Sequence, residues 1–347
     1  MRNNWKTMSL ASLFAPLLLL TVPNENGYCA TAKPITFKLA HNQAENHPVN
    51  LGAAKFAELV KERTGGRVMI DVFPANVLGP ESATRDMIKD GTLSMVAMGG
   101  PSLSPYGGAV DLTSMLYGFR SEDEMLAVLE GDFGQKWFYK AFIKDHGVRV
   151  LDQWPMLPRV TMSKKEFQAI TDLKGVKIRV VSGIPVWERS WSALGAMTVA
   201  LSLDECFSGI QQGVADAVEG PLDQHFFFSF QEVTKYLVRT NHNYYTQMIL
   251  INESVYQKLS PEDQKILEQS AKDAGKLFYS ERNRLAEEIQ QKMVKDFGIK
   301  VIDQTDEEIK GFMDAVQPLY EQLMNMWGKE CLEDFTAAIK AYRDSKK

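Results

Sequence analysis

The sequence contains few of the features that identify disulfide-rich, nucleic-acid-binding or membrane-spanning proteins. Only three of its 347 residues are cysteines, too few for a disulfide scaffold. Its 44 acidic residues outnumber its 39 lysines and arginines, giving a net charge of −5, and without a basic block the chain is a poor candidate for binding nucleic acid. Beyond residue 32, no apolar run reaches the ~20 residues that a membrane-spanning helix needs. The length and composition fit a soluble protein of two domains.

The common catalytic and metal-binding motifs are missing as well. The chain has no glycine-rich nucleotide loop, no G-x-S-x-G serine elbow, no H-E-x-x-H zinc helix and no C-x-x-C pair. His41 and His47 are close in the sequence, but no third metal ligand follows in a suitable register. We therefore expect no metal and no cofactor. Because catalytic residues can also be assembled from dispersed positions, the missing motifs argue only mildly against an enzyme.

Residues 1–32 have the pattern of a signal peptide. Basic residues precede the uncharged stretch 8–22, and the small residues at 30–32 suit a signal peptidase. The apolar stretch is too short to span a membrane, so a retained anchor is the weaker alternative. Lipidation at Cys29 is disfavoured because no small residue directly precedes it. We predict export from the cytoplasm, with cleavage after Ala32.

Cleavage would leave a mature chain, 33–347, which we expect to be soluble and monomeric. Two cysteines would remain, Cys206 and Cys331, and an oxidising compartment would permit them to pair. Their separation in the sequence gives no geometric indication of a disulfide, so a bridge between them is not the favoured prediction.

Two series of alternating strand and helix patterns predict an α/β fold with two lobes. In the first, strand patterns at 35–40 and 67–73 flank a helical pattern at 49–64, which predicts two parallel strands joined by a right-handed crossover. The second series extends over 177–219. An irregular, proline-containing stretch at 154–158 separates the two series, which favours two sheets rather than one.

The last third of the chain predicts one long helix. Ser260 is a good N-cap residue, followed by a proline and two acidic residues in the first turn. No further proline occurs up to Phe297, and Gly275 is the single interruption. Such a helix would be about 50 Å long, longer than one lobe of this size. It either breaks near Gly275 or crosses between the lobes, and we favour the crossing.

Arg179 is the most informative candidate for a binding residue. Strand alternation places Lys177 and Arg179 on one face, opposite Val176, Ile178 and Val180. Arg179 lies near the carboxyl end of the predicted strand, where open α/β sheets bind ligands. There its planar fork could bind a carboxylate, although a surface arginine is the plain alternative.

Seven short stretches, in order, carry a resemblance to a known family. They are FAELV at 56–60, VFP at 72–74, LG at 78–79, DLKGVKIRV at 172–180, LGA at 194–196, QQGVADAVE at 211–219 and NESVY at 252–256. Residues 33 to about 340 resemble the DctP-like solute-binding proteins of tripartite ATP-independent periplasmic (TRAP) transporters.

The resemblance implies a type II periplasmic-binding-protein fold, with two α/β lobes joined by crossing strands and a long bridging helix. Lobe I would comprise 33–156 and 244–284. Lobe II would comprise 157–243 and, with the C-terminal helices, 285–347. A small organic anion would bind between the lobes.

The resemblance also implies most of the binding residues. Arg179 would grip the ligand carboxylate and Arg159 would assist it. Asn42, which follows the first strand, matches a position that commonly contacts ligand, and Gln247 is a weaker candidate.

One departure and several aromatic residues bear on the kind of ligand. Glu219 is also assigned to the site, but Gly220 follows it where many relatives carry asparagine. The lost amide makes a sugar acid with many hydroxyls less attractive. Trp154, in the crossing segment, is expected to line the pocket, whereas Trp191 is expected in the core. The other aromatic residues near expected cleft positions are Trp187, Phe226, Phe227, Phe228, Tyr244 and Tyr245. An aromatic acid, a small acid beside an apolar wall, or a sulfonate would suit such a site.

The function that the resemblance implies is capture of an organic anion and delivery to the membrane subunits of a TRAP permease. Two alternatives stay open: a periplasmic sensor that docks on a receptor, and an enzyme on the same scaffold.

Overall fold

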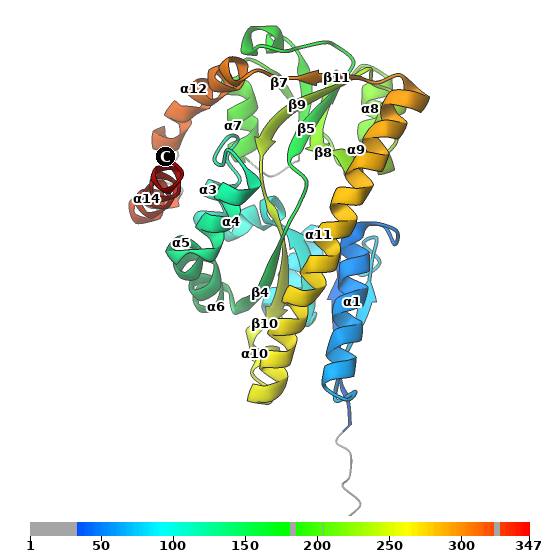
Figure 1. The fold of residues 1–347 in the computed structure, drawn as a ribbon, viewed down its shortest axis with the longest axis vertical. Coiled ribbons are helices and arrows are strands. Elements are labelled where there is room, and N and C mark those ends of the chain that lie inside the picture. Colours follow the sequence, from blue (N-terminus) through cyan, green and yellow to red (C-terminus); the bar gives the residue numbers. More distant parts are fainter. Residues whose placement is uncertain (1–32, 181–184, 204, 323–326) are drawn as a thin grey trace, which may run out of the picture. The chain divides into compact units, whose positions relative to one another are not determined.

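Residues 33–180, 185–203, 205–322 and 327–347 are described by the structure, a computed structural model (Figure 1). Residues 34–347 form one compact unit built around two mixed β-sheets. The predicted signal peptide at 1–32 lies outside the described residues. No helix within the described ranges is long and apolar enough to cross a membrane.

The first sheet has the strand order β2-β1-β3-β10-β4 and contains the predicted strand–helix–strand unit. Its strands are β1 (Ile35–Ala40), β2 (Val68–Phe73), β3 (Met95–Gly99), β4 (Val148–Pro155) and β10 (Thr246–Asn252). β1 pairs in parallel with β2 and β3, and the connections are helices α1 (Pro48–Arg63) and α2 (Glu81–Asp90). β10 lies antiparallel between β3 and β4. The apolar periodicity therefore predicted both these elements and their parallel pairing.

The second sheet has the order β11-β9-β5-β8-β6-β7. Its strands are β5 (Arg159–Ser163), β6 (Lys177–Val180), β7 (Met197–Ala200), β8 (Ala217–Pro221), β9 (Tyr236–Asn243) and β11 (Lys300–Asp303). β6 runs parallel to β7 and β8, connected through α7 (Pro185–Ala193) and α8 (Cys206–Gln211). β5 is antiparallel to both of its neighbours, β8 and β9. Two separate sheets confirm the predicted two-lobed α/β fold.

The remaining helical segments cover the sheets and connect them. They are η1 (Gly100–Tyr106), α3 (Ala109–Thr113), α4 (Glu122–Glu130), α5 (Asp132–Gly134), η2 (Gln135–Lys140), α6 (Ala141–His146), η3 (Ile170–Leu173), α9 (Leu222–Phe227), η4 (Phe230–Glu232), α10 (Glu253–Tyr256), α11 (Pro261–Phe297), α12 (Asp306–Gln322) and α14 (Lys329–Ser345). η2 is a π-helical turn, and the other η segments are 3₁₀ helices.

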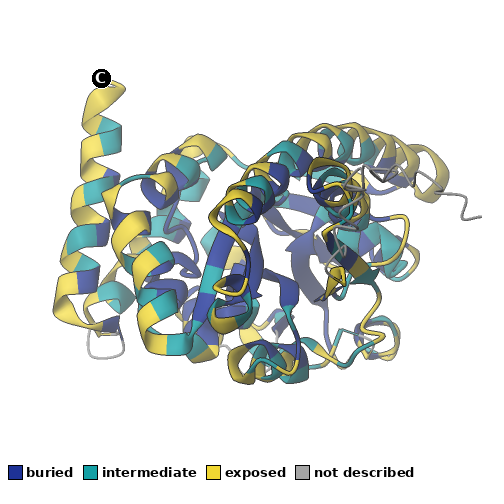
Figure 2. Cartoon of the chain, turned by 90° about the horizontal axis from the view of Figure 1, so that it is seen from below, coloured by how far each residue is buried: buried dark blue, intermediate teal, exposed yellow. Residues whose placement is uncertain are grey.

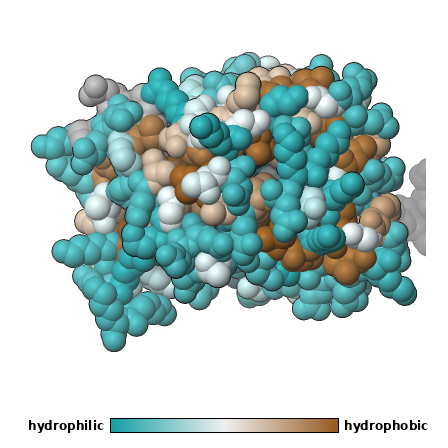
Figure 3. All heavy atoms as spheres, turned by 90° about the horizontal axis from the view of Figure 1, so that it is seen from above, coloured by the Kyte–Doolittle hydropathy of each residue, from teal (hydrophilic) through white to brown (hydrophobic). Residues whose placement is uncertain are grey.

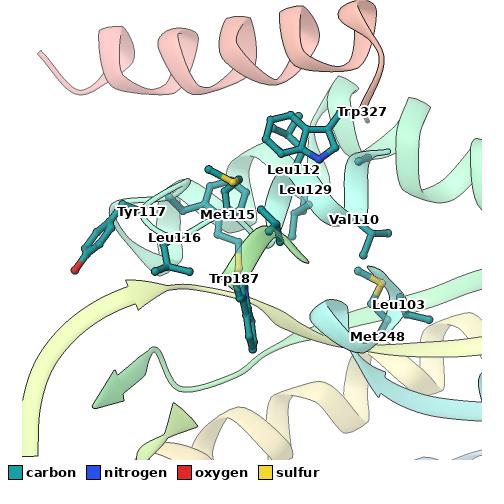
Figure 4. Close-up of a cluster of buried hydrophobic side chains, with 14 of the residues drawn as sticks. Leu103, Val110, Leu112, Met115, Leu116, Tyr117, Leu129, Trp187, Met248 and Trp327 are labelled. Atoms are coloured by element: carbon teal, nitrogen blue, oxygen red, sulfur yellow. The ribbon is translucent and has the colours of Figure 1, made fainter. Parts of the chain in front are cut away.

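Three hydrophobic clusters make up the core. The largest joins residues of both sheets with α3 to α6, α12 and α14, and Figure 4 shows part of it, with Trp187 and Met248 below the α3 region and Trp327 above it. The second lies between the first sheet, α1 and α11, and the third packs the second sheet against α8, η4 and the end of α11. Cys331 belongs to the first cluster and Cys206 to the third, and no disulfide joins these two buried thiols.

Burial follows this arrangement. In Figure 2 the strands are mostly dark blue, whereas the helices carry yellow, exposed residues along their outer faces. On the face drawn in Figure 3, hydrophilic side chains predominate and hydrophobic residues form separate patches among them. The amphipathic helices thus turn their apolar stripes towards the sheets.

The chain passes from one sheet to the other in three places. β4 ends at Pro155 and β5 begins at Arg159, while β9 ends at Asn243 and β10 begins at Thr246. α11 makes the third passage, from beside β10 and β4 to the end of the second sheet at β11 (Figure 1). The lobe boundaries at 156/157, 243/244 and 284/285 stay a prediction.

Helix α11 is continuous over 37 residues, as the crossing alternative predicted. The Ser260 hydroxyl accepts the N–H of Asp263 at its start, and Gly298 ends it in the left-handed conformation at φ 67°. Arg282, buried near its middle, donates to the Glu122 carboxylate at 2.8 Å and to the carbonyl of Pro155. These bonds fasten the helix to α4 and to the first crossing.

Gly275 does not break α11 but allows it to approach Trp154. A Cβ at Gly275 would lie 2.8 Å from the indole Nε1, and a Cβ at Gly52 in α1 would lie 2.7 Å from the far edge of the same ring. The indole also stacks on Phe278, with 5.4 Å between ring centroids, and its Nε1–H donates to the Asp152 carboxylate. Two helices therefore meet at one tryptophan because each has a glycine there.

We predict that Gly275→Ala destabilises the protein by about 1–3 kcal/mol, because overpacking against Trp154 outweighs the better helix propensity of alanine. Gly311→Ala in α12 is the matched control, since a Cβ there would meet only Ile170 at 3.8 Å. Urea unfolding should show this control unchanged or slightly more stable. Equal effects of the two substitutions would contradict the packing argument.

Candidate functional site

A cavity of about 600 Å³ lies between residues of the two sheets. From the first sheet's side, Asn42 follows β1 and Gly99 ends β3, and from the second, Arg179 lies in β6 and Leu201 follows β7. All four positions are at or near the carboxyl ends of parallel strands, where open α/β sheets bind ligands. The cavity is therefore the candidate site.

Arg159 lies in the wall of the cavity and forms a bidentate ion pair with Glu219. Its Nε and Nη2 donate to the two carboxylate oxygens at 2.6 and 2.9 Å, and both side chains are buried. The guanidinium also lies over the rings of Trp187 and Tyr245, at 4.5 and 5.5 Å from the ring centroids. Burial alone would lower the pKa of Arg159, but the Glu219 carboxylate holds that pKa above its ordinary value. Arg159 is thus fixed and charged.

A third group holds Glu219 from behind. The Nε2 of His242 lies 3.2 Å from the carboxylate, and its Nδ1 lies 2.7 Å from the Thr240 hydroxyl. Burial lowers the pKa of His242 despite the opposing effect of Glu219, so the ring is neutral near pH 7. Since an ionised carboxylate only accepts hydrogen bonds, Nε2 carries the proton and Thr240 donates to Nδ1.

The prediction that Glu219 contacts ligand needs correction. Glu219 does not line the cavity; both of its oxygens face Arg159 and His242. It acts as a positioning residue for Arg159. Burial opposes its ionisation, but the Arg159 charge and the two sets of hydrogen bonds hold the pKa of Glu219 well below its ordinary value.

Arg179 also lines the cavity, and it differs from Arg159 in its partners. Its side chain is 2 % exposed, and its Nε donates to the Leu201 carbonyl at 3.0 Å. Among the described residues, no carboxylate oxygen lies within 4 Å of its guanidinium. Burial lowers the pKa of Arg179 and so does nearby Arg159, while the Cys206 thiol and Glu219 raise it. This buried cation is thus the group best placed to pair with an anion.

Two amide side chains in the cavity have unused hydrogen-bonding atoms. The Oδ1 of Asn42 and the Nε2 of Gln247 are buried and have no hydrogen-bond partner among the described residues. An unsatisfied buried polar atom costs about 1–3 kcal/mol, so a polar ligand that meets one offsets this cost. The structure therefore brings Asn42 and Gln247 into the same cavity as Arg159 and Arg179.

Trp154 was expected to line this cavity, and the structure contradicts that prediction. The indole is 1 % exposed and is packed between α1 and α11 as described above. The aromatic wall is made instead by Trp187, Phe228 and Tyr245. Trp191 lies in the core, as expected, edge-on to His242.

Gly220 does not leave the site without an amide. A Cβ at Gly220 would lie 2.8 Å from the Oε1 of Gln224, which lines the cavity from α9. The side chain of Gln224 thus occupies the space in front of Gly220. Gly220 therefore no longer argues against a sugar acid as the ligand, because the Gln224 amide is present at this place.

Sequence patterns did not identify Glu81 and Arg85 as site residues. Both lie in α2, and both line the cavity. The Glu81 Oε2 accepts from the Ser102 hydroxyl at 2.9 Å, and Arg85 donates to the Ser102 carbonyl at 3.0 Å. Burial raises the pKa of Glu81, while Ser102, Arg85 and Arg159 oppose the rise. In the sequence, Glu81 is an acidic residue in the first turn of a helix, a common position for one, so nothing marks it as a site residue.

The described residues contain no group of three or more histidine, cysteine or acidic side chains that could hold a metal ion. His41 is bonded to Asn50 at 3.1 Å. His47 caps α1 by accepting the Val49 N–H at Nδ1, and its Nε2–H donates to Asp223 at 3.0 Å. Their imidazoles thus have structural partners.

Residues 39–326 match the model of bacterial extracellular solute-binding protein family 7, the DctP family. The chain belongs to this family. In sequence it is 29 % identical to the 2,3-diketo-L-gulonate-binding periplasmic protein YiaO of Escherichia coli, over 85 % of this chain and 88 % of that protein.

Solved structures of TRAP periplasmic solute-binding proteins have the same fold. One from Ochrobactrum anthropi, with its C-terminus bound in the ligand-binding pocket, is 29 % identical with a TM-score of 0.83, covering 90 % of this chain and 97 % of that one. Another, from Sulfurospirillum deleyianum with bound succinate, is 27 % identical with a TM-score of 0.77, covering 88 % and 99 %.

We predict that Glu219→Gln costs this solute-binding protein about 3–5 kcal/mol at pH 7, because it leaves Arg159 buried without its anion. The folded-state pKa of Glu219 lies below its ordinary value of 4.5, so its stabilisation is present above that value and decreases as pH falls through it. The stability difference from the wild type should narrow below pH 4.5 by about 1.4 kcal/mol per pH unit. Urea unfolding between pH 7 and pH 3.5 measures it.

Glu281→Gln provides the control, because Glu281 pairs with Arg284 on the outer face of α11. It should change stability by less than about 0.5 kcal/mol at any of these pH values. A pH-independent deficit in Glu219→Gln would show that the pair is not ionised in the folded protein.

Proposed function

We propose that this solute-binding protein captures a small organic anion in the cavity and delivers it to a TRAP-type membrane permease for uptake. The observation that carries the proposal is Arg179, a buried guanidinium at the carboxyl end of β6 with no carboxylate within 4 Å among the described residues. Burying an unpaired charge is costly, and an anion bound in the cavity would remove that cost.

The neighbouring residues have complementary roles in this proposal. Arg179 anchors the acid group of the ligand, and Arg159, held by Glu219, provides a second cation. Asn42 offers a hydrogen-bond acceptor and Gln247 a donor, at atoms that no residue in the described part of the chain uses. A carboxylate suits the planar guanidinium forks, and a sulfonate would suit the same groups.

The ligand would also couple the two lobes. Asn42 and Glu81 belong to the half built on the first sheet, and Arg159 and Arg179 to the half built on the second. A solute that contacts both favours the arrangement in which they face each other, by no more than its difference in affinity between the open and closed arrangements. The permease could then distinguish the loaded protein from the empty one.

The family relationship supports this reading over a sensor or an enzyme. A relative binds 2,3-diketo-L-gulonate and a solved relative holds succinate, and both are organic acids. We further propose that residues 1–32 direct export and are removed, that the mature protein is a monomer in the periplasm, and that neither cofactor nor metal takes part.

The site assignment predicts that Arg179→Met weakens binding of every organic acid about 100-fold or more, since charged hydrogen bonds contribute about 1.5–3 kcal/mol each. Isothermal titration calorimetry with four- to six-carbon carboxylates and sulfonates, chosen by thermal shift, measures the loss. The melting temperature without added acid should not fall, because the substitution removes an unpaired buried charge.

Arg239→Met is the matched control, because Arg239 lies on β9, pairs with Asp303 and does not line the cavity. It should bind acids like the wild type. Retained binding in Arg179→Met would refute the assignment of the anchor.

The export proposal predicts a mature chain that begins at Lys33. Intact-mass measurement of the protein from a periplasmic extract should give the mass of 33–347. A full-length mass, or a lipid adduct on Cys29, would contradict it.

A further inference from the structure

We propose that Glu81 makes the site selective for monoanions that carry a hydrogen-bond donor, such as hydroxy acids, over dicarboxylates. This inference rests on the proposed function, because it takes Arg179 as the anchor of the acid group. It adds a second determinant, a carboxylate in the wall of an anion-binding cavity.

The formal charges around the cavity leave room for one negative charge. The wall contains three guanidinium groups, those of Arg85, Arg159 and Arg179. The charge of Arg159 is balanced by its bidentate pair with Glu219. Glu81 is the acidic residue of the described wall, and Glu219 pairs with Arg159 behind that wall, so two carboxylates face three guanidinium groups. The Asp86 carboxylate, 3.8 Å from the Arg85 Nε, is 78 % exposed, and solvent screens its charge. A ligand with one negative charge brings the net charge of this set to zero, whereas a dianion would make it negative.

Arg85 is poorly placed to bind a second carboxylate of a ligand. It follows Glu81 by four residues on α2, so the two side chains share one face of the helix, and each charge lies in the field of the other. Its Nη1 donates to the Ser102 carbonyl, and its Nε lies 3.8 Å from the Asp86 carboxylate. A second ligand carboxylate at Arg85 would therefore also approach Glu81 and be repelled by it.

The hydrogen bonds of Glu81 indicate what it does accept. Its Oε2 takes the proton of the Ser102 hydroxyl at 2.9 Å. Its Oε1 accepts no hydrogen bond from the described residues, and the side chain is half-buried in the wall. An ionised carboxylate has only acceptor sites, so its complement on a ligand is a hydroxyl or another N–H or O–H donor. A hydrogen bond to this charged, half-buried group discriminates against ligands that lack the donor.

The two ends of the cavity thus differ in polarity. Arg179, with Arg159 beside it, attracts the acid group, and Glu81, on the half built on the first sheet, requires a donor. Trp187, Tyr245 and Phe228 supply apolar surface in the same wall. The ligand class that matches all three features is a small hydroxy monocarboxylate.

The test compares sets of four- to six-carbon acids that differ only at the end away from the carboxylate: ω-hydroxy acid, unsubstituted acid and dicarboxylate. With the wild-type protein at pH 7.5, calorimetry should show the hydroxy acid binding about tenfold or more tightly than its two counterparts. In Glu81→Gln, the affinity for the dicarboxylate should rise about tenfold or more, because a neutral amide no longer repels it.

Asp90→Asn is the control, since Asp90 lies at the exposed end of the same helix, accepts hydrogen bonds from Thr92 and does not line the cavity. It should keep the wild-type order of affinities. Wild-type protein that binds dicarboxylates as well as hydroxy acids, or a Glu81→Gln variant with an unchanged order, would overturn the inference while leaving the proposed function intact. Failure of all the acids to bind, or binding that persists in Arg179→Met, would instead count against the proposed function.

Discussion

Two guanidinium groups buried in the wall of one cavity, those of Arg159 and Arg179, are the constraint on which this site depends. Each would be costly on its own in a low-dielectric environment, and each raises the cost of the other. Within the protein, the Glu219 carboxylate balances the charge of Arg159, and a hydrogen bond from His242 holds that carboxylate in place. Arg179 has no such carboxylate among the described residues. Arg159 therefore keeps its geometry whether or not a solute is bound. Arg179 is the arginine whose charge a bound solute would balance.

The sheets explain how this arrangement is held in place. Glu219 on β8 lies opposite Thr161 on β5, two residues from Arg159, and β9 brings His242 to the other side of β5. Groups fixed on adjacent strands cannot move independently, which preorganises the cationic half of the cavity. The complementary half, with Asn42 and Glu81, is carried by the first sheet and α2. Its position relative to the cations depends on the two strand crossings and on α11.

Much of the fold could be predicted because local patterns determine it. Apolar periodicity gave the strand–helix–strand unit, and the cap at Ser260 gave the start of α11. Arg179 was found from its place near a strand end. Contacts between distant elements had no signal in the local sequence. Gly275 suggested a break in the helix, but it allows the helix to approach the indole of Trp154. Glu219 was expected to contact the ligand, but it forms an ion pair with Arg159. Such contacts depend on strand register and helix approach, which a single sequence does not reveal.

The net charge of −5 in the whole chain bears on how an anion is attracted. At physiological ionic strength, charges separated by more than about 8 Å of solvent are largely screened, so the acidic surface neither steers nor strongly repels a solute at a distance. Inside the cavity, burial removes that screening, and individual groups decide the outcome. Three arginines by themselves would favour a dianion, but Glu219 and Glu81 face two of these charges. Selectivity therefore follows the number of charges left unbalanced in the cavity, not the number of arginines that line it.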